Sequence, residues 1–183
     1  MKMLSLRRCR TFLLYGFLFL AALPGAHAQS DPAAAPDAQI RKIRAEYEQI
    51  NKSTLTRKAV RWSSPDSCQP AYMEGTVTYF YKNAQLVKIY SEGGEDHGEW
   101  KEEFYFRDGK LFFVYQNNAY GGAANPVEVK YQNRYYFDEG KLIWKIQSKG
   151  APDTEVAQLM KLAARLAATT GKAEVSRIMG CGD

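Results

Sequence analysis

The chain has 183 residues with 25 lysines and arginines and 20 acidic residues, which gives a formal net charge of +5 at pH 7. Four of the basic residues and none of the acidic ones fall in the first 28 positions, so the remaining 155 residues carry a net charge of +1. A nearly neutral chain without a basic cluster has no electrostatic attraction to nucleic acid, and we exclude nucleic acid as a partner. A chain of that length suits a single domain with a substantial core.

The first 28 residues have the pattern of an export signal. Basic residues are followed by an apolar run over 12–23 and by Ala26-His27-Ala28, a small-residue cleavage site. The apolar run is shorter than the roughly 20 residues of a spanning helix, and no second run follows it. We expect cleavage near Ala28 and a periplasmic or secreted mature protein with no integral membrane segment. The alanine-rich residues 29–36, with two prolines, are expected to form a disordered spacer.

Two amphipathic helices are predicted, one on each side of the centre of the chain. The first covers 37–52, where four apolar residues recur on one face: Ile40, Ile43, Tyr47 and Ile50. The second covers 153–170, where an alanine-rich apolar face ends before Gly171, a typical helix stop. The tail over 172–183 has apolar residues for one more helical turn.

Residues 74–147 repeat one pattern three times: an aromatic pair, a polar turn, then leucine and an apolar run. Each copy is typical of a β-hairpin, and Asp-Gly is the strongest turn signal because it supplies positive φ cheaply. The predicted turns are Asn83-Ala84, Asp108-Gly109 and Glu139-Gly140. The strands are expected near 74–82, 86–91, 99–107, 110–116, 127–137 and 141–147, with a further candidate within 54–62. We therefore predict an α+β fold, an antiparallel β-meander of about six strands flanked by an N-terminal and a C-terminal helix, in a single domain over 37–183.

Aromatic residues occupy both faces of the predicted strands. Of the 20 that follow position 28, 17 lie between 74 and 147. Alternation places Phe104 and Phe106 on one face, which we expect to meet both helices, and Tyr105 on the other. The second face is either covered, by sheet curvature or by the 53–62 segment, or open to a partner that stacks on aromatic rings. For an open face the predicted binding residues are Tyr105, Phe112, Tyr115, Tyr136 and Trp144.

Two loops between the hairpins, over 92–98 and 117–126, are polar, and we expect them to be exposed. The first is either a weak site for a hard cation or a solvated acidic tip. Its candidate ligands are Glu92, Asp96, His97 and Glu99. His97 is the only histidine after position 28, which excludes zinc sites that need several imidazoles. The chain has no P-loop, no Gly-x-Ser-x-Gly motif and no dinucleotide fingerprint, so we predict no cofactor and no catalytic residue.

Two cysteines, Cys68 and Cys181, follow the predicted signal. We expect them to pair in an oxidising compartment, the alternative being two unrelated thiols. A bond that closes a loop of roughly 110 residues stabilises the fold by about 4 to 5 kcal/mol in the chain-entropy picture. It would also hold the C-terminal tail to the segment before residue 74.

The predicted first helix runs from Ile40-Arg41-Lys42-Ile43-Arg44 to Ile50-Asn51, and repeats such as Phe104-Tyr105-Phe106-Arg107-Asp108-Gly109-Lys110-Leu111 follow it. Over residues 40–147 this pattern resembles uncharacterised exported proteins of Gram-negative bacteria with an N-terminal helix and aromatic-rich β-hairpin repeats. It also loosely resembles MORN-type hairpin repeats, of whose glycines it keeps Gly75. Neither resemblance implies an activity.

We expect a non-enzymatic binding module that recognises an envelope protein or a glycan through the aromatic face of the sheet. The alternative is a small cell-envelope hydrolase that uses carboxylates of the 92–99 loop. A third interpretation, an inhibitor or immunity protein that blocks a toxin or a lysozyme, belongs to the class of binding modules.

Overall fold

The computed structural model describes residues 37–68, 72–95, 98–122, 125–152 and 154–181. The predicted export signal and the spacer over 29–36 lie outside these residues. None of the described helices is long and apolar enough to cross a membrane.

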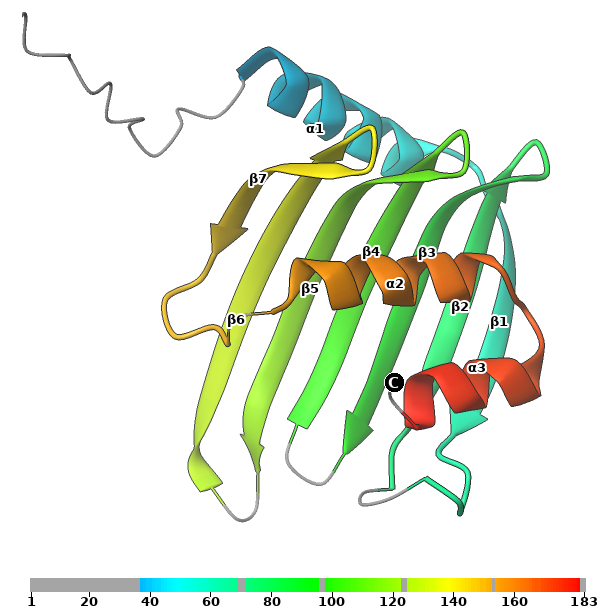
Figure 1. Cartoon of the computed structure of the whole chain (residues 1–183), viewed down its shortest axis with the longest axis vertical. Coiled ribbons are helices and arrows are strands. Elements are labelled where there is room, and N and C mark those ends of the chain that lie inside the picture. Colours follow the sequence, from blue (N-terminus) through cyan, green and yellow to red (C-terminus); the bar gives the residue numbers. More distant parts are fainter. Residues whose placement is uncertain (1–36, 69–71, 96–97, 123–124, 153, 182–183) are drawn as a thin grey trace, which may run out of the picture. The chain divides into compact units, whose positions relative to one another are not determined.

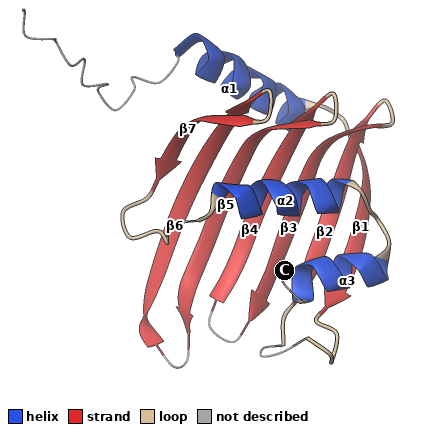
Figure 2. Ribbon diagram, in the orientation of Figure 1, coloured by secondary structure: helices blue, strands red, loops and turns tan. Residues whose placement is uncertain are grey.

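A sheet of seven antiparallel strands forms the centre of the described structure, and each strand lies beside its neighbours in sequence (Figure 1). Helices precede and follow the sheet in the chain (Figure 2). The predicted α+β meander is therefore confirmed. In chain order the elements are α1 (Asp37–Lys52), β1 (Thr56–Ser63), β2 (Glu74–Lys82), β3 (Gln85–Glu95), β4 (Gly98–Arg107), β5 (Lys110–Gly122), β6 (Asn125–Asp138), β7 (Lys141–Gln147), α2 (Val156–Ala167) and α3 (Lys172–Gly180).

Three tight turns join β2 to β3, β4 to β5 and β6 to β7 at the predicted positions. Both central residues of each turn have positive φ, which is the geometry of a type I′ turn. The φ angles are 51° and 64° at Asn83 and Ala84, 49° and 76° at Asp108 and Gly109, and 46° and 77° at Glu139 and Gly140. Such turns match the twist of the paired strands, so local sequence fixes the register of these hairpins.

The sheet is larger than the sequence predicts. The candidate strand within 54–62 is β1, so the described sheet has seven strands rather than about six. β5 and β6 also continue into the segment 117–126, where Asn117 lies opposite Gln132 and Asn118 lies opposite Tyr131. β3 likewise continues to Glu95, and β4 begins at Gly98. The prediction of loops over 92–98 and 117–126 was therefore wrong for their described residues, because backbone hydrogen bonds hold a strand pair together and polar side chains do not interrupt them.

Different helices cover the two faces of the sheet. α2 and α3 pack on the face that carries Phe104 and Phe106. α1 packs on the opposite face, where its isoleucines, including Ile43, contact the side that carries Tyr105 and Tyr136. In Figure 1, α1 lies along the end of the sheet where the three tight turns are. The expectation that both predicted helices share one face was wrong, because both faces are aromatic-rich and each offers apolar surface to a helix.

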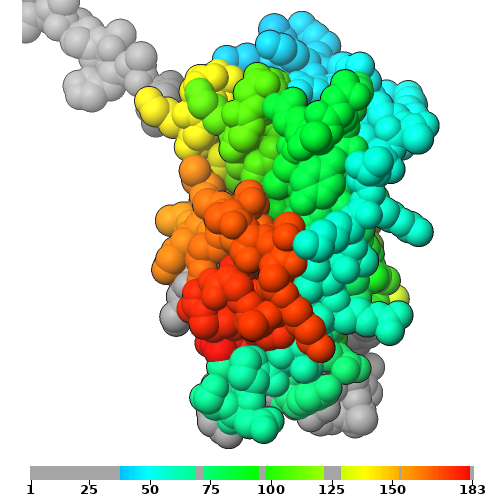
Figure 3. Space-filling model, turned by 90° about the vertical axis from the view of Figure 1, so that its right-hand side faces the viewer, coloured from blue at the N-terminus to red at the C-terminus, as the bar shows by residue number. Residues whose placement is uncertain are grey.

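The C-terminal tail forms a complete helix, α3, which packs against β1. Figure 3 shows α2 and α3, in orange and red, beside the β1 edge in cyan. The predicted disulfide joins Cys68 to Cys181, with their Cα atoms 4.8 Å apart. Gly180 permits this approach, because a Cβ at that position would lie 2.7 Å from the Cα of Ser64. The end of α3 is therefore held both by a covalent bond and by close packing.

Candidate functional site

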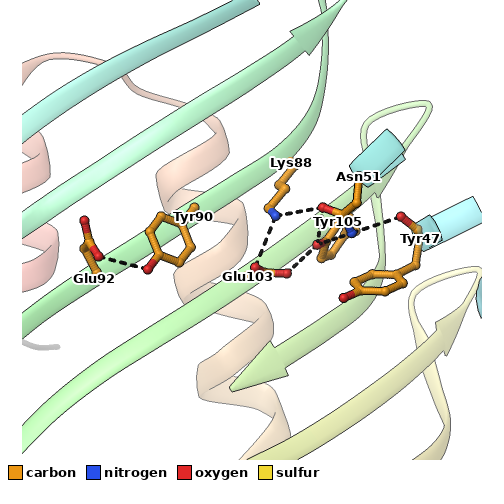
Figure 4. A network of polar contacts seen from close by, with 7 residues as sticks. All are labelled: Tyr47, Asn51, Lys88, Tyr90, Glu92, Glu103 and Tyr105. Atoms are coloured by element: carbon orange, nitrogen blue, oxygen red, sulfur yellow. Dashed lines mark hydrogen bonds and ion pairs between the residues drawn. The ribbon is translucent and has the colours of Figure 1, made fainter. Parts of the chain in front are cut away.

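A network of polar contacts fixes the C-terminal half of α1 on the sheet (Figure 4). The hydroxyl of Tyr105 donates a hydrogen bond to the carboxylate of Glu103 and accepts one from Asn51, whose Nδ2 lies 2.9 Å away. Lys88 completes the network, because its Nζ lies 3.2 Å from Glu103 Oε1 and 3.0 Å from Asn51 Oδ1. The ring of Tyr47 packs edge-on against that of Tyr105, with the centroids 5.0 Å apart. The network thus holds α1 in place and encloses Tyr105.

The Tyr105 hydroxyl serves the fold rather than a ligand. Burial, followed by the negative charge of Glu103, raises the pKa of Tyr105 far above its ordinary value. The hydroxyl therefore keeps its proton and acts as a neutral donor to Glu103. Because the hydroxyl already forms hydrogen bonds with Glu103 and Asn51, Tyr105 belongs to the contact between α1 and the sheet.

The five residues predicted for an open binding face are mostly covered by α1. Tyr105, Phe112 and Tyr136 are 0%, 3% and 1% exposed, whereas Tyr115 and Trp144 are half-buried. The structure therefore does not present these rings as one flat, open surface. What stays accessible is the border between α1 and the middle of the sheet.

A groove with a volume of about 400 Å³ follows this border. We call it the α1 groove. One wall is α1, and the floor comes from β5, β6 and β7. Its lining residues are Ile43, Arg44, Tyr47, Glu48, Phe113, Tyr115, Arg134, Tyr136 and Ile146.

Two arginines lie over tyrosine rings in the α1 groove. Tyr115 and Arg134 are opposite each other in the pairing of β5 with β6, and the Arg134 Cζ is 5.3 Å from the centroid of the Tyr115 ring. Arg44 reaches from α1 to Tyr136, with its Cζ 5.8 Å from the ring centroid and its Nε 3.4 Å from the hydroxyl. A guanidinium over an aromatic face is attracted by the ring quadrupole and is held in position by it.

Neither arginine forms an ion pair among the described residues. The one carboxylate of the α1 groove, Glu48, lies 3.2 Å from the Nζ of Lys52. Arg134 donates one hydrogen bond to Gln132, 3.4 Å away. A guanidinium has five N–H donors that match a carboxylate in bidentate geometry. The groove therefore combines two cationic groups with apolar and aromatic walls.

Sequence reasoning missed Arg44, Tyr47 and Arg134. A signal for Arg134 was present, because alternation along β6 places it on the same face as Tyr136. Tyr47 was assigned to the apolar stripe of α1, and in the structure it does contact the sheet while also lining the groove. Arg44 gave no signal, since its role depends on which face of the sheet α1 covers.

The predicted cation site in the 92–99 loop is only partly described, because Asp96 and His97 lie outside the described residues. Glu92 accepts a hydrogen bond from the hydroxyl of Tyr90 at 2.9 Å, and Glu99 Oε1 lies 3.7 Å from the Nζ of Lys101. Burial and then the bond to Glu92 raise the pKa of Tyr90 to about 12. Within the described part of the chain, no group of three His, Cys, Asp or Glu residues could hold a metal ion.

A larger hollow of about 610 Å³ lies at the edge formed by β1, β2 and β3. Three glycines contribute to its lining, and both of its carboxylates accept hydrogen bonds from tyrosines: Glu74 from Tyr72 at 3.0 Å, and Glu92 from Tyr90. Its acidic groups are therefore engaged within the protein, which makes it a weaker candidate than the α1 groove.

Comparisons with protein families, with curated proteins and with solved structures found no match to this chain. The lining of the α1 groove offers guanidinium donors that can hold an anion and apolar walls that can contact the group that carries it.

Proposed function

We propose that the protein is a non-enzymatic binding module that holds an acidic segment of a partner protein in the α1 groove. The observation that carries the proposal is the pair Arg44 and Arg134, which lie over tyrosine rings and form no ion pair among the described residues. A carboxylate of the partner would supply the missing counter-charge.

The environment of the α1 groove favours such a contact. Arg134 is half-buried, so a carboxylate placed against it is partly removed from water, where charge–charge attraction is stronger. A hydrogen bond to a charged group contributes about 1.5 to 3 kcal/mol, and a bidentate pair adds specificity of orientation. The apolar side chains Ile43, Phe113 and Ile146 offer contact area for a neighbouring apolar residue of the partner. An alternating acidic and apolar segment would use both features.

The geometry favours a protein over a glycan. A sugar stacks on an aromatic ring whose face is open, but in the α1 groove the Arg134 guanidinium lies over Tyr115, and Tyr136 is 1% exposed. Beyond the groove, the same face of the sheet continues as a polar surface that includes Lys101, Asn117 and Gln132. An apolar and cationic centre beside a polar surface is typical of a protein–protein interface.

We place this module outside the cytoplasm, in the periplasm or as a secreted protein. The Cys68–Cys181 disulfide is compatible with an exported protein, since such bonds persist in oxidising compartments. The export signal predicted over residues 1–28 supports the same location.

The test is selection from a random peptide library with the chain from Gln29 as bait. We expect enrichment of peptides in which Asp or Glu alternates with apolar or aromatic residues, with binding that weakens as salt rises. The variant Arg44→Glu/Arg134→Glu should lose these peptides. Both positions are solvent-accessible, so the variant should stay folded.

The matched control is Arg41→Glu/Arg57→Glu, which makes the same change of charge at exposed positions of α1 and β1 that do not line the groove. It should retain the selected peptides. Equal loss in both variants would assign binding to net charge alone. Selection of peptides without acidic residues, or capture of glycans only, would contradict the proposal.

A further inference from the structure

A second pocket, of about 440 Å³, lies on the opposite face of the sheet from the α1 groove. β4 and β5 form its floor, with Glu102 and Gln116, and α2 and α3 form its walls. The apolar residues of the walls are Leu159, Leu162, Ile178 and Met179. The lining also includes Thr154, Gln158 and Arg165, so the walls combine apolar and polar side chains above a polar base.

The floor belongs to a polar row that crosses four strands in register. Ser91 lies opposite Glu102, Glu102 opposite Gln116, and Gln116 opposite Asn133. All four are buried. Asn133 donates to Gln116 Oε1 at 3.2 Å, and Gln116 donates through Nε2 to Glu102 Oε1 at 2.8 Å. The chain of hydrogen bonds ends on the carboxyl group of Glu102 and orients it.

Glu102 is a buried carboxyl group that takes part in no ion pair between described residues. It is 9% exposed. Burial raises the pKa of Glu102, while hydrogen bonds from Gln116 and Asn118 act in the opposite direction. Taking a carboxylate out of water is costly unless a positive charge accompanies it. In the polar row, the buried hydroxyl of Ser91 also has no hydrogen-bond partner among the residues that the structure describes.

We propose that this pocket binds a small organic ammonium ion, whose charged group pairs with Glu102 and whose aliphatic part packs against Leu159, Leu162, Ile178 and Met179. A primary ammonium supplies the positive charge that the carboxylate lacks and three donors in a compact group. An alkyl chain of a few carbons gains about 0.8 kcal/mol for each CH₂ that it buries against the walls. A hard metal ion fits less well, because it requires several oxygen ligands and Glu102 is the one carboxylate among the described lining residues.

One other ionisable side chain lines the described part of this pocket, Arg165 of α2. Because its guanidinium could bind an anion, the experiment must distinguish binding of a cation at Glu102 from binding of an anion at Arg165. Butylammonium is therefore the probe, with butyrate as the anion of similar shape and butanol as the neutral control. The readout is the shift of backbone amide signals of α2, α3 and β4 in two-dimensional NMR, which detects weak binding.

We expect butylammonium to shift the backbone amide signals around the pocket. Butyrate and butanol should leave these signals unchanged. Binding should strengthen as pH rises through the pKa of Glu102, because the deprotonated form is the partner. Glu102→Gln preserves shape and the acceptor for Gln116, and it should weaken binding at least tenfold. Glu99→Gln makes the same change of charge at an exposed position of β4 and should leave binding unchanged.

A second variant, Gln158→Trp, tests the pocket without a change at Glu102, so the test does not depend on the folding of Glu102→Gln. Gln158 is exposed on α2 and lines the pocket, so a large ring there should block entry while Glu102 stays intact. The proposal is overturned if the parent protein shows no shift with butylammonium, if butyrate or butanol gives the same shifts, or if the folded Glu102→Gln variant binds as well as the parent.

Discussion

Replacing Tyr105 tests whether its ring belongs to the core rather than to a binding surface. The side chain is 0% exposed, packs against Tyr47 and Phe113 with centroids 5.0 and 5.7 Å away, and donates to the Glu103 carboxylate. Tyr105→Ala removes the ring and leaves a cavity beneath α1. Tyr105→Phe removes only the hydroxyl and leaves Glu103 and Asn51 without that partner.

The expected losses differ for the two changes. Truncation of a buried aromatic residue costs about 3 to 5 kcal/mol, and a ring that buries about 150 to 250 Å² gives a similar figure at about 25 cal/mol per Å². We take about 4 kcal/mol for Tyr105→Ala, which lowers the melting temperature by about 8 to 16 °C in a chain of this length. Tyr105→Phe should cost about 1.5 to 3 kcal/mol, the contribution of a hydrogen bond to a charged group.

Urea unfolding followed by circular dichroism measures both changes. Tyr115→Ala is the comparison, because its ring is half-buried in the α1 groove and its loss should cost less than that of Tyr105. If Tyr105→Ala unfolds at the same urea concentration as the parent, the ring is not in the core, and the position of α1 described above is wrong.

Two further predictions concern stability. The variant Cys68→Ser/Cys181→Ser should lose about 5 kcal/mol of unfolding free energy, because the bond closes a loop of 113 residues; a loss below about 1 kcal/mol in urea unfolding would contradict this. For Glu102, a folded-state pKa raised above the ordinary 4.5 means that the folded protein holds the proton more tightly than the unfolded chain. The contribution of Glu102 to the unfolding free energy should therefore be greatest below pH 4.5 and fall as pH rises through the raised pKa, and Glu102→Gln should remove that contribution. If the unfolding free energies of the parent and of Glu102→Gln change with pH in parallel, the prediction for Glu102 is wrong.

The meander could be predicted because its signals are local. Asp108-Gly109 specifies a type I′ turn by itself, and the alternation of Phe104, Tyr105 and Phe106 assigns them to opposite faces without reference to the rest of the chain. The disulfide was predictable because only two cysteines, Cys68 and Cys181, follow the predicted export signal. The face that α1 covers was not predictable, since apolar rings on both sides offer it equivalent partners.

The sites depend on long-range packing, and the sequence shows them only in part. Glu102 lies between Lys101 and Glu103 in the sequence, and nothing in this charged run distinguishes it from its two neighbours. Alternation with Phe104 does place it on the core face, which was the available signal. That it lines a pocket follows only from the positions of α2 and α3, helices that lie more than fifty residues further along the chain.

The central claim is that a partner protein occupies the α1 groove, and site-specific photo-crosslinking tests it most directly. A photoreactive residue is placed at Glu48, which lines the groove, or at Arg41, which does not, in protein expressed in the producing cells. The account predicts a crosslinked partner from position 48, absent from position 41 and lost when Arg44→Glu/Arg134→Glu is added. An identical set of crosslinks from both positions, or a crosslink at position 48 that survives the charge reversal, would contradict it.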